Sequence, residues 1–384
     1  MRLWLHTVVV VAYVLSGSVA ALAQPQLKAG FIYIGPIGDY GWTHAHEQAR
    51  KIVDERFPWL ETTYVESVPE GEVATFVEQM IRQGVQLIFP TSFGYMDGTL
   101  EAATRAPEVL FAHASGFKRH ANMATYMADF YQVYYLNGLM AGALTKSGKV
   151  GYVGAFPIPE VKRHIDAFAL GLRAVKPQAE VHVRWIFSWF NPAAAKEATE
   201  ALITAGADVF AFTEDSPTVE QVAAQHGLPS FGHYSPMHDF AVHHVVSGQL
   251  VHWEKIYDDF LRKVHSGAYT SKNLQDVDYW WLLAEGAVEL GGKPGLPINP
   301  AFVDQLKAVK VKDPTEGEIS VYDLVFKRLA QMSQPTLTFD PFQGPIRDRK
   351  DILRVAADKR MSQQELITME WAAPGVVGPW ANEP

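Results

Sequence analysis

The chain has 384 residues, and its 33 Lys and Arg against 42 Asp and Glu give a formal net charge of −9. It has no cysteine, which excludes disulfides, thiol catalysis and zinc–thiolate sites, and no basic run of the kind that binds nucleic acid or anionic membranes. A chain of this length is too long for one ordinary hydrophobic core, so two domains are expected.

The start of the chain has the three parts of an export signal. Arg2 gives a positive start, residues 8–15 are apolar, and Ala21 and Ala23 place small side chains before a cleavage site. We therefore expect residues 1–23 to be a cleaved signal peptide and the mature protein to be periplasmic. A transmembrane anchor is the alternative, but the apolar run is shorter than the roughly 20 residues that span a bilayer. Because no cysteine stands at the cleavage site, a lipid anchor is not expected.

After this leader, short apolar runs alternate with stretches of helical periodicity. The expected strands of this first series are residues 28–35, 62–68, 85–92, 108–115 and 122–129. The expected helices are residues 42–57, 71–84, a stretch after Gly94, and 130–145. Apolar strands that alternate with helices of this length indicate a parallel sheet with helices on both faces.

The same alternation starts again at residue 149. The expected strands of this second series are residues 149–156, 180–187, 208–215 and 228–234. The expected helices are residues 160–175, 192–205 and 218–226. Two such series predict an α/β protein with two Rossmann-like lobes, each built on a parallel sheet.

The rest of the chain is less regular. It has expected strands at 241–247 and 287–290, an expected helix at 251–265, an amphipathic stretch at 315–334, and an expected helix near 362–369. If helix 251–265 packs on the first lobe, the chain crosses between the lobes more than once. The expected division is therefore residues 27–130 with 250–275 in the first lobe, residues 131–249 with 276–312 in the second, and residues 313–384 as an insertion with a C-terminal extension.

Ligands of parallel α/β sheets bind beyond the carboxyl ends of the strands, and here each loop at such an end carries a ring or a carboxylate. The candidate ligand-binding residues in these loops are Tyr40, Trp42, Ser92, Phe93, Tyr95, Phe156, Trp189, Asp215 and Tyr234. Rings from two facing lobes would form a slot for a flat ligand, and Asp215 would accept hydrogen bonds from it. The alternative for each ring is packing under its own loop, and for Asp215 it is a role at a helix N-terminus.

At these loops the sequence resembles the BMP (basic membrane protein) family of ABC-transporter substrate-binding proteins, which includes purine nucleoside receptors of the PnrA type. The resemblance is carried by GFIYIGPIGDYGWTHAHEQAR, LIFPTSFGYM, FPIPEV, SWFNP and TEDSP. It implies a class I periplasmic binding-protein fold, a purine nucleoside or a free base such as adenine held between the lobes, and an ABC permease as partner. It also implies a monomer without catalytic residues, cofactor or metal.

The resemblance extends to single residues. It places Trp42 at the stacking ring of the first lobe, Phe93 and Tyr95 in a second cleft loop, Trp189 and Asp215 in loops of the second lobe, and Trp253 near the later crossing. Two departures leave the ligand open. Trp281 and Leu282 stand where the family has two glycines and could fill part of the cleft, and the stretch 315–334 is longer than usual.

Three other functions are alternatives to this interpretation. An enzyme is not expected, because the paired histidines His44/His46 and His243/His244 point in different directions and no HExxH, GxSxG or P-loop motif is present. A class I sugar-binding protein stays open, although the loops contain few amides and no arginine. A receptor that presents its ligand to a signalling partner also stays open.

Overall fold

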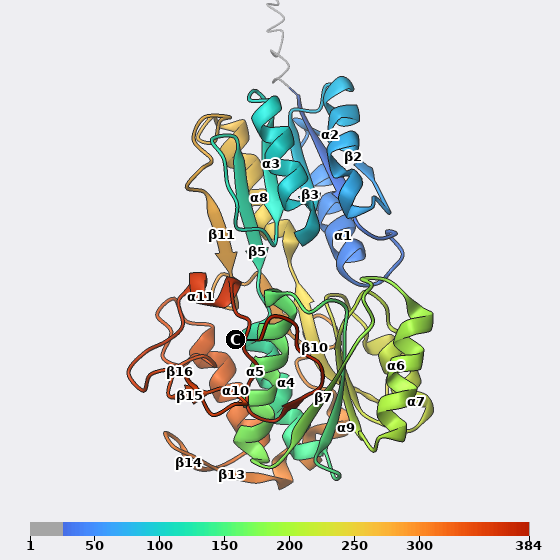
Figure 1. The fold of residues 1–384 in the computed structure, drawn as a ribbon, viewed down its shortest axis with the longest axis vertical. Helices are drawn as coiled ribbons and strands as arrows, with labels where there is room; N and C mark the ends of the chain where they lie inside the picture. The colour runs from blue at the N-terminus through green and yellow to red at the C-terminus, as the bar shows by residue number, and fades with distance from the viewer. Residues whose placement is uncertain (1–25, 384) are drawn as a thin grey trace, which may run out of the picture.

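The computed structural model describes residues 26–383, so the predicted signal peptide at residues 1–23 lies outside the described residues. The chain forms two lobes, one above the other in Figure 1, and each is a sheet flanked by helices. The predicted α/β class with two Rossmann-like lobes is confirmed. Among the described residues, no helix is both long and apolar enough to cross a membrane.

The first lobe is built on six parallel strands in the order β11-β5-β4-β3-β1-β2. These strands are β1 (Leu27–Tyr33), β2 (Leu60–Val65), β3 (Leu87–Thr91), β4 (Leu110–Ala114), β5 (Met123–Ala128) and β11 (Asp278–Trp281). Its helices are α1 (Trp42–Arg56), α2 (Val73–Arg82), α3 (Met96–Arg105) and α8 (Trp253–His265). Every residue of β3 and of β5 is buried, as expected for strands with helices on both faces.

The second lobe has a seven-stranded sheet in the order β12-β10-β9-β8-β6-β7-β17, in which only β12 is antiparallel to its neighbour. Its strands are β6 (Lys149–Gly154), β7 (Glu180–Trp185), β8 (Val209–Thr213), β9 (Ser230–Gly232), β10 (Val245–Val251), β12 (Val288–Leu290) and β17 (Val376–Val377). Its helices are α4 (Tyr131–Leu144), α5 (Pro159–Val175), α6 (Pro192–Thr204), α7 (Thr218–Gln225), α9 (Pro300–Ala308) and α10 (Val321–Met332).

The chain crosses between the lobes three times, after β5, after β10 and after β11. The expected division placed residues 276–312 in the second lobe, and here the structure differs. Strand β11 pairs with β5 in the first sheet, where Asp278 accepts a hydrogen bond from Thr125 and forms an ion pair with Arg119. Of residues 276–312, only those from β12 onward belong to the second lobe, so the third crossing falls after Trp281.

Helices α4 and α5 pack in direct backbone contact behind the second sheet. A Cβ at Gly138 on α4 would lie 2.1 Å from the Phe168 carbonyl oxygen, and a Cβ at Gly171 on α5 would lie 2.1 Å from the Tyr135 carbonyl oxygen. Glycine at both positions therefore lets the two helices approach this closely. Their contact fixes the position of the α5 N-terminus, which points toward the first lobe.

Residues 335–383, named here the C-terminal strap, wrap around the second lobe (Figure 1). The strap contains the hairpin β15 (Ile346–Arg347) and β16 (Leu353–Val355), the short helix α11 (Gln363–Ile367), and β17, which pairs with β7 at the sheet edge. A second hairpin, β13 (Lys310–Asp313) with β14 (Gly317–Ser320), precedes α10. The amphipathic stretch expected at 315–334 is thus β14 followed by α10.

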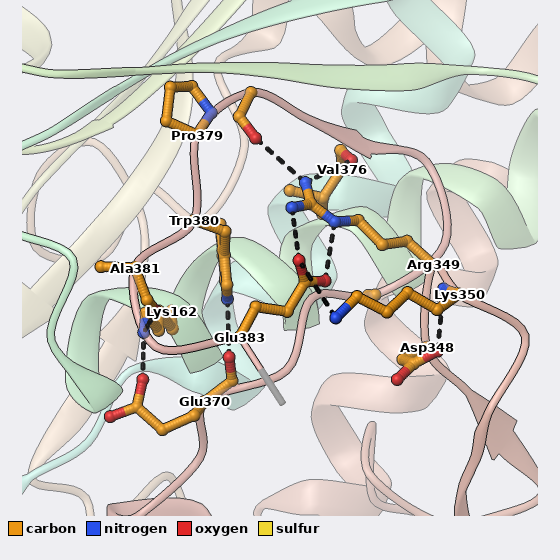
Figure 2. Close-up of polar contacts among 12 residues, drawn as sticks. Lys162, Asp348, Arg349, Lys350, Glu370, Val376, Pro379, Trp380, Ala381 and Glu383 are labelled. Atoms are coloured by element: carbon orange, nitrogen blue, oxygen red, sulfur yellow. Dashed lines mark hydrogen bonds and ion pairs between the residues drawn. The ribbon is translucent and has the colours of Figure 1, made fainter.

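Ion pairs fasten the strap to α5 (Figure 2). The ammonium group of Lys162 contacts the Glu370 carboxylate and the Ala381 carbonyl oxygen, and Lys162 is fully buried. Within the strap, the Arg349 guanidinium contacts the Glu383 carboxylate at 2.8 Å. The strap also covers an edge of the second sheet, because β17 pairs with β7, whose backbone groups would otherwise be unpaired.

Candidate functional site

A narrow cavity lies between the two lobes. The first lobe lines it with Ile34, Trp42, Ser92, Phe93 and Ser115, and the second with Glu160, Trp189, Asp215 and Tyr234. All of these residues lie at or just beyond the carboxyl ends of strands, where the topology predicts a site.

Trp42 forms the floor of the cavity from the first turn of α1. Its indole Nε1 donates to the Thr91 carbonyl oxygen at 2.6 Å, and its ring meets those of Tyr234 and Trp253 edge to face at 5.3 and 5.2 Å. Trp253 in turn stacks on the His46 ring at 4.4 Å. Trp42 therefore has a fixed orientation, with only 6% of its surface exposed.

Asp215 approaches Trp42 from the second lobe. Its Oδ1 accepts the Trp42 backbone N–H at 3.1 Å, whereas its buried Oδ2 has no hydrogen-bond partner among the described residues. A Cβ at Gly41 would lie 2.5 Å from the Asp215 Cα, so only glycine permits this approach. Burial raises the pKa of Asp215, and the nearby charge of Asp39 raises it further.

Asp39 itself has a local structural role. Its carboxylate accepts backbone N–H groups from Gly41, Thr43 and His44 at 2.8 to 3.1 Å, at the start of α1. Carboxylates are favourable at this end of a helix, because the unpaired N–H groups there need acceptors. Asp39 thereby fixes the loop that presents Trp42.

Glu160 supplies a second carboxylate to the cavity from the first turn of α5. It accepts a hydrogen bond from the Ser115 hydroxyl of the other lobe and one from the Tyr234 hydroxyl at 3.5 Å. Burial raises the pKa of Tyr234, and the Glu160 charge adds to this effect, so the phenol stays a donor. Glu160 and Asp215 thus make two separate contacts between the lobes.

The structure brings together six of the ten residues that the sequence analysis selected: Trp42, Ser92, Phe93, Trp189, Asp215 and Tyr234. The other four lie elsewhere. Tyr40 is exposed and stacks on His44, and the Tyr95 hydroxyl donates to the Val68 carbonyl in the core. Phe156 borders an outer pocket next to Trp189, and Trp253 lies behind Trp42.

Sequence reasoning missed Ile34, Ser115 and Glu160. Ser115 ends an expected strand, and Glu160 follows Pro159 in a selected loop, so the rule that found Asp215 applies to both. Trp281 and Leu282, which could have filled the cleft, do not line the cavity. They lie at and just after the end of β11, where the Trp281 carbonyl oxygen accepts the Asp129 backbone N–H at 3.0 Å.

Every side-chain donor on the cavity wall is already engaged. The Ser92 hydroxyl and the Trp189 indole donate to Glu70 at 2.7 and 3.4 Å. The Ser115 and Tyr234 hydroxyls donate to Glu160, and the Trp42 indole donates to Thr91. The free capacity that remains is that of acceptors: the Asp215 Oδ2 and the lone pairs of hydroxyl and carboxylate oxygens.

No group of three or more His, Asp or Glu side chains within residues 26–383 is placed to hold a metal ion. The neighbouring histidines have separate partners, since His46 contacts the Tyr257 hydroxyl at 2.5 Å and His44 the Ile37 carbonyl at 3.1 Å. The rings and acceptors of the cavity wall are suited to hold a flat ligand between the lobes.

Comparisons with known proteins identify the family of the chain. The family model of PnrA-like ABC transporter substrate-binding proteins matches residues 26–323. A purine-binding protein of Brucella abortus is 36% identical over 369 residues, which cover 96% of this chain and 97% of that protein. A putative ABC transporter glucose-binding protein of Haloferax volcanii is 38% identical over 284 residues, which cover 74% of this chain and 71% of that protein.

Solved structures agree on the fold. An ABC transporter solute-binding protein from Aeropyrum pernix superposes with a TM-score of 0.65 at 16% identity, over 80% of this chain and 91% of that one. A periplasmic solute-binding protein from Actinobacillus succinogenes with bound D-allose gives a TM-score of 0.54 at 14% identity, over 69% of this chain and 97% of that one.

Proposed function

Because this chain belongs to the PnrA-like family of ABC transporter substrate-binding proteins, we propose that it binds an amine-bearing purine base, such as adenine, between its lobes and delivers it to an ABC permease. The observation that carries the choice of ligand is the acceptor-only wall of the cavity. A ligand that presents N–H groups satisfies the free Asp215 Oδ2 and favours the ionised carboxylate against the burial that raises its pKa, whereas a carbonyl oxygen would face another oxygen there.

The rings of the cavity support a flat ligand. Trp42, Phe93 and Trp189 come from both lobes, and stacking on aromatic rings contributes about 1–3 kcal/mol per base. Micromolar affinity needs about 8 kcal/mol, which two stacked faces and a few hydrogen bonds to buried acceptors can supply.

Binding without chemistry follows from this arrangement. One lobe offers its rings in the open form, and closure adds the acceptors and rings of the other, so a ligand that contacts both lobes stabilises the closed form. The permease then takes the ligand from the closed protein. This family works outside the cytoplasm, and we propose that residues 1–23 direct the chain to the periplasm, where it is a monomer without a lipid anchor.

Sugar binding is the second candidate. It is favoured by the Haloferax relative, which is described as a putative glucose-binding protein, and by sugar hydroxyls, which can donate to Asp215 and Glu160. Against it, the cavity wall among the described residues has no arginine and no amide side chain to donate to the oxygen atoms of the sugar hydroxyls. A ligand receptor for a signalling partner would use the same cavity and the same ligand.

The test is calorimetric titration of the purified protein with adenine, hypoxanthine, adenosine and D-glucose. Adenine carries an amine at C6 and a bare ring nitrogen at N1, whereas hypoxanthine carries a carbonyl oxygen at C6 and a hydrogen on N1, so only adenine can present its C6 substituent to Asp215 as a donor. We expect adenine to bind with micromolar or tighter affinity and hypoxanthine at least about tenfold more weakly, in line with one unsatisfied polar contact. Tighter binding of D-glucose than of adenine would establish the second candidate instead.

A further inference from the structure

Glu70 lies outside the cavity, yet it holds the loop that forms one wall of it. The residue belongs to the short turn that precedes α2, and its side chain reaches the loop after β3. Its Oε1 accepts the Ser92 hydroxyl at 2.7 Å and the Gly94 backbone N–H at 3.1 Å. These two bonds fix the chain on either side of Phe93, which lines the cavity.

The packing at this point is as specific as the hydrogen bonding. A Cβ at Gly94 would lie 2.1 Å from the Glu70 Cδ, so the carboxylate sits directly against the glycine backbone. No other residue at position 94 would leave room for this contact, since real Cβ contacts are never so short. Ser92 is buried, and with its hydrogen donated to Glu70 it offers only lone pairs to the cavity.

The same oxygen of Glu70 also reaches the second lobe. The Trp189 indole Nε1 donates to Oε1 at 3.4 Å. Trp189 borders both the cavity and an outer pocket that Glu70, Phe156 and Phe187 line, so its ring separates the ligand site from that pocket. The Trp189 backbone is fixed in turn, because its carbonyl accepts the Asp215 N–H at 2.7 Å.

We propose that Glu70 is a positioning residue for ligand binding, and that its Oε1 has two roles. It holds Ser92 and Phe93 in place in the first lobe, and it latches Trp189 across the mouth of the cavity when the lobes close. This inference rests on the proposed function for the ligand, but the latch is a contact between the lobes. It slows the escape of a bound ligand more than it speeds capture, because the Trp189 contact forms only on closure.

The latch is tested by stopped-flow measurement of adenine association and dissociation. We expect Glu70→Ala to raise the dissociation rate about tenfold with little change in association rate, as expected for loss of a charge-assisted hydrogen bond. Glu70→Gln should retain most of the wild-type behaviour, since its side-chain carbonyl can accept the same hydrogen bonds. Glu72→Ala, at an exposed residue of the same turn, is the matched control and should match the wild type.

A double-mutant cycle separates the latch from a purely structural effect. Trp189→Phe keeps a ring but removes the N–H, so Glu70→Ala should accelerate dissociation less in that background than in the wild type. Equal acceleration in both backgrounds, or a wild-type dissociation rate in Glu70→Ala, would overturn the latch.

The cycle does not depend on adenine being the ligand. If D-glucose binds the wild type and adenine does not, the proposed ligand fails, and the same cycle is run with D-glucose. Glu70→Ala should again raise the dissociation rate more in the wild-type background than in Trp189→Phe. A wild-type dissociation rate for D-glucose in Glu70→Ala would overturn the latch by itself.

Discussion

Carboxylates in two regions of this molecule are partnered differently. Under the C-terminal strap, Glu370 faces the ammonium of Lys162 and Glu383 faces the guanidinium of Arg349. In the cavity between the lobes, Asp215 and Glu160 accept only neutral N–H and O–H groups among the described residues. The carboxylates of the strap form ion pairs that stabilise the fold, whereas those of the cavity can still accept hydrogen bonds from a ligand.

The pKa values of Glu383 in the strap and Asp215 in the cavity shift in opposite directions. Hydrogen bonds from Arg349 lower the pKa of Glu383, while burial and the charge of Asp39 raise the pKa of Asp215. A carboxylate whose pKa is raised by its surroundings is held at a cost in stability, which is common where a protein binds a ligand. Substitutions in the strap should therefore change stability alone, and substitutions in the cavity should change affinity first.

The largest effect is expected at Trp42, because its ring belongs to both the cavity and the core. A substitution there should therefore change both affinity and stability. Trp42→Ala should weaken adenine binding more than tenfold and lower the free energy of unfolding by about 3–5 kcal/mol, as for other buried aromatic truncations. Calorimetry and urea denaturation measure the two losses.

Tyr40→Asn is the matched control for Trp42→Ala. Tyr40 lies in the same loop with an exposed ring and a left-handed backbone (φ 61°), a conformation that Asn tolerates. Adenine affinity should stay at the wild-type value in this variant. Unchanged adenine affinity in Trp42→Ala would contradict the stacking role of Trp42.

The second largest effect is expected at Asp215. Asp215→Asn keeps an oxygen that can accept the Trp42 N–H but removes the charge and places an amide beside the ligand. Adenine affinity should fall by about 10- to 100-fold, the range for one hydrogen bond to a charged group. The free energy of unfolding should not fall, because the variant removes a buried carboxylate without a cationic partner. Lower stability with unchanged affinity would assign Asp215 to the fold alone.

The sequence predicted the two sheets and six residues of the cavity wall because both depend on local pattern. Trp42, Phe93, Trp189 and Asp215 each follow an apolar run, and parallel strands bring such positions to one edge. Strand β11 was not foreseen, since its short run carries no period and its pairing with β5 bridges a long stretch of chain. The predicted helix near 362–369 is α11, but the way the strap wraps around the second lobe was not foreseen, because single ion pairs such as Lys162–Glu370 leave no periodic signal.

A smaller effect, on stability alone, is expected in the strap. Lys162→Met keeps the length of the side chain but leaves the Ala381 carbonyl oxygen and the Glu370 carboxylate without their cation. Because Glu370 is partly exposed, the loss should be about 1–3 kcal/mol, below that of a fully buried pair. Adenine affinity should not change. Lys359→Met, at an exposed lysine of the strap, is the control and should leave both quantities unchanged.

The smallest effect is expected from a third group of carboxylates, at the second crossing between the lobes. His252 contacts Glu254 of α8 at 3.1 Å and Glu289 of β12 at 3.0 Å, so one ring joins the two lobes. Hydrogen bonds to Glu254 and Glu289 raise the pKa of His252 from 6.5 to about 9. This group resembles the strap, since its carboxylates are paired with a cation, but here the cation can titrate.

The stability that His252 contributes should therefore depend on pH. A group whose pKa is higher in the folded protein stabilises fully below its unfolded pKa of 6.5 and loses this contribution as the pH rises through about 9. Because the ring and Glu289 are partly exposed, we expect a loss of only about 1 kcal/mol over this range. Urea denaturation of the wild type and of His252→Gln at a series of pH values measures it. The two should differ most at the acidic end and converge near pH 9, and a constant difference would show that His252 stabilises the crossing by packing and not by charge.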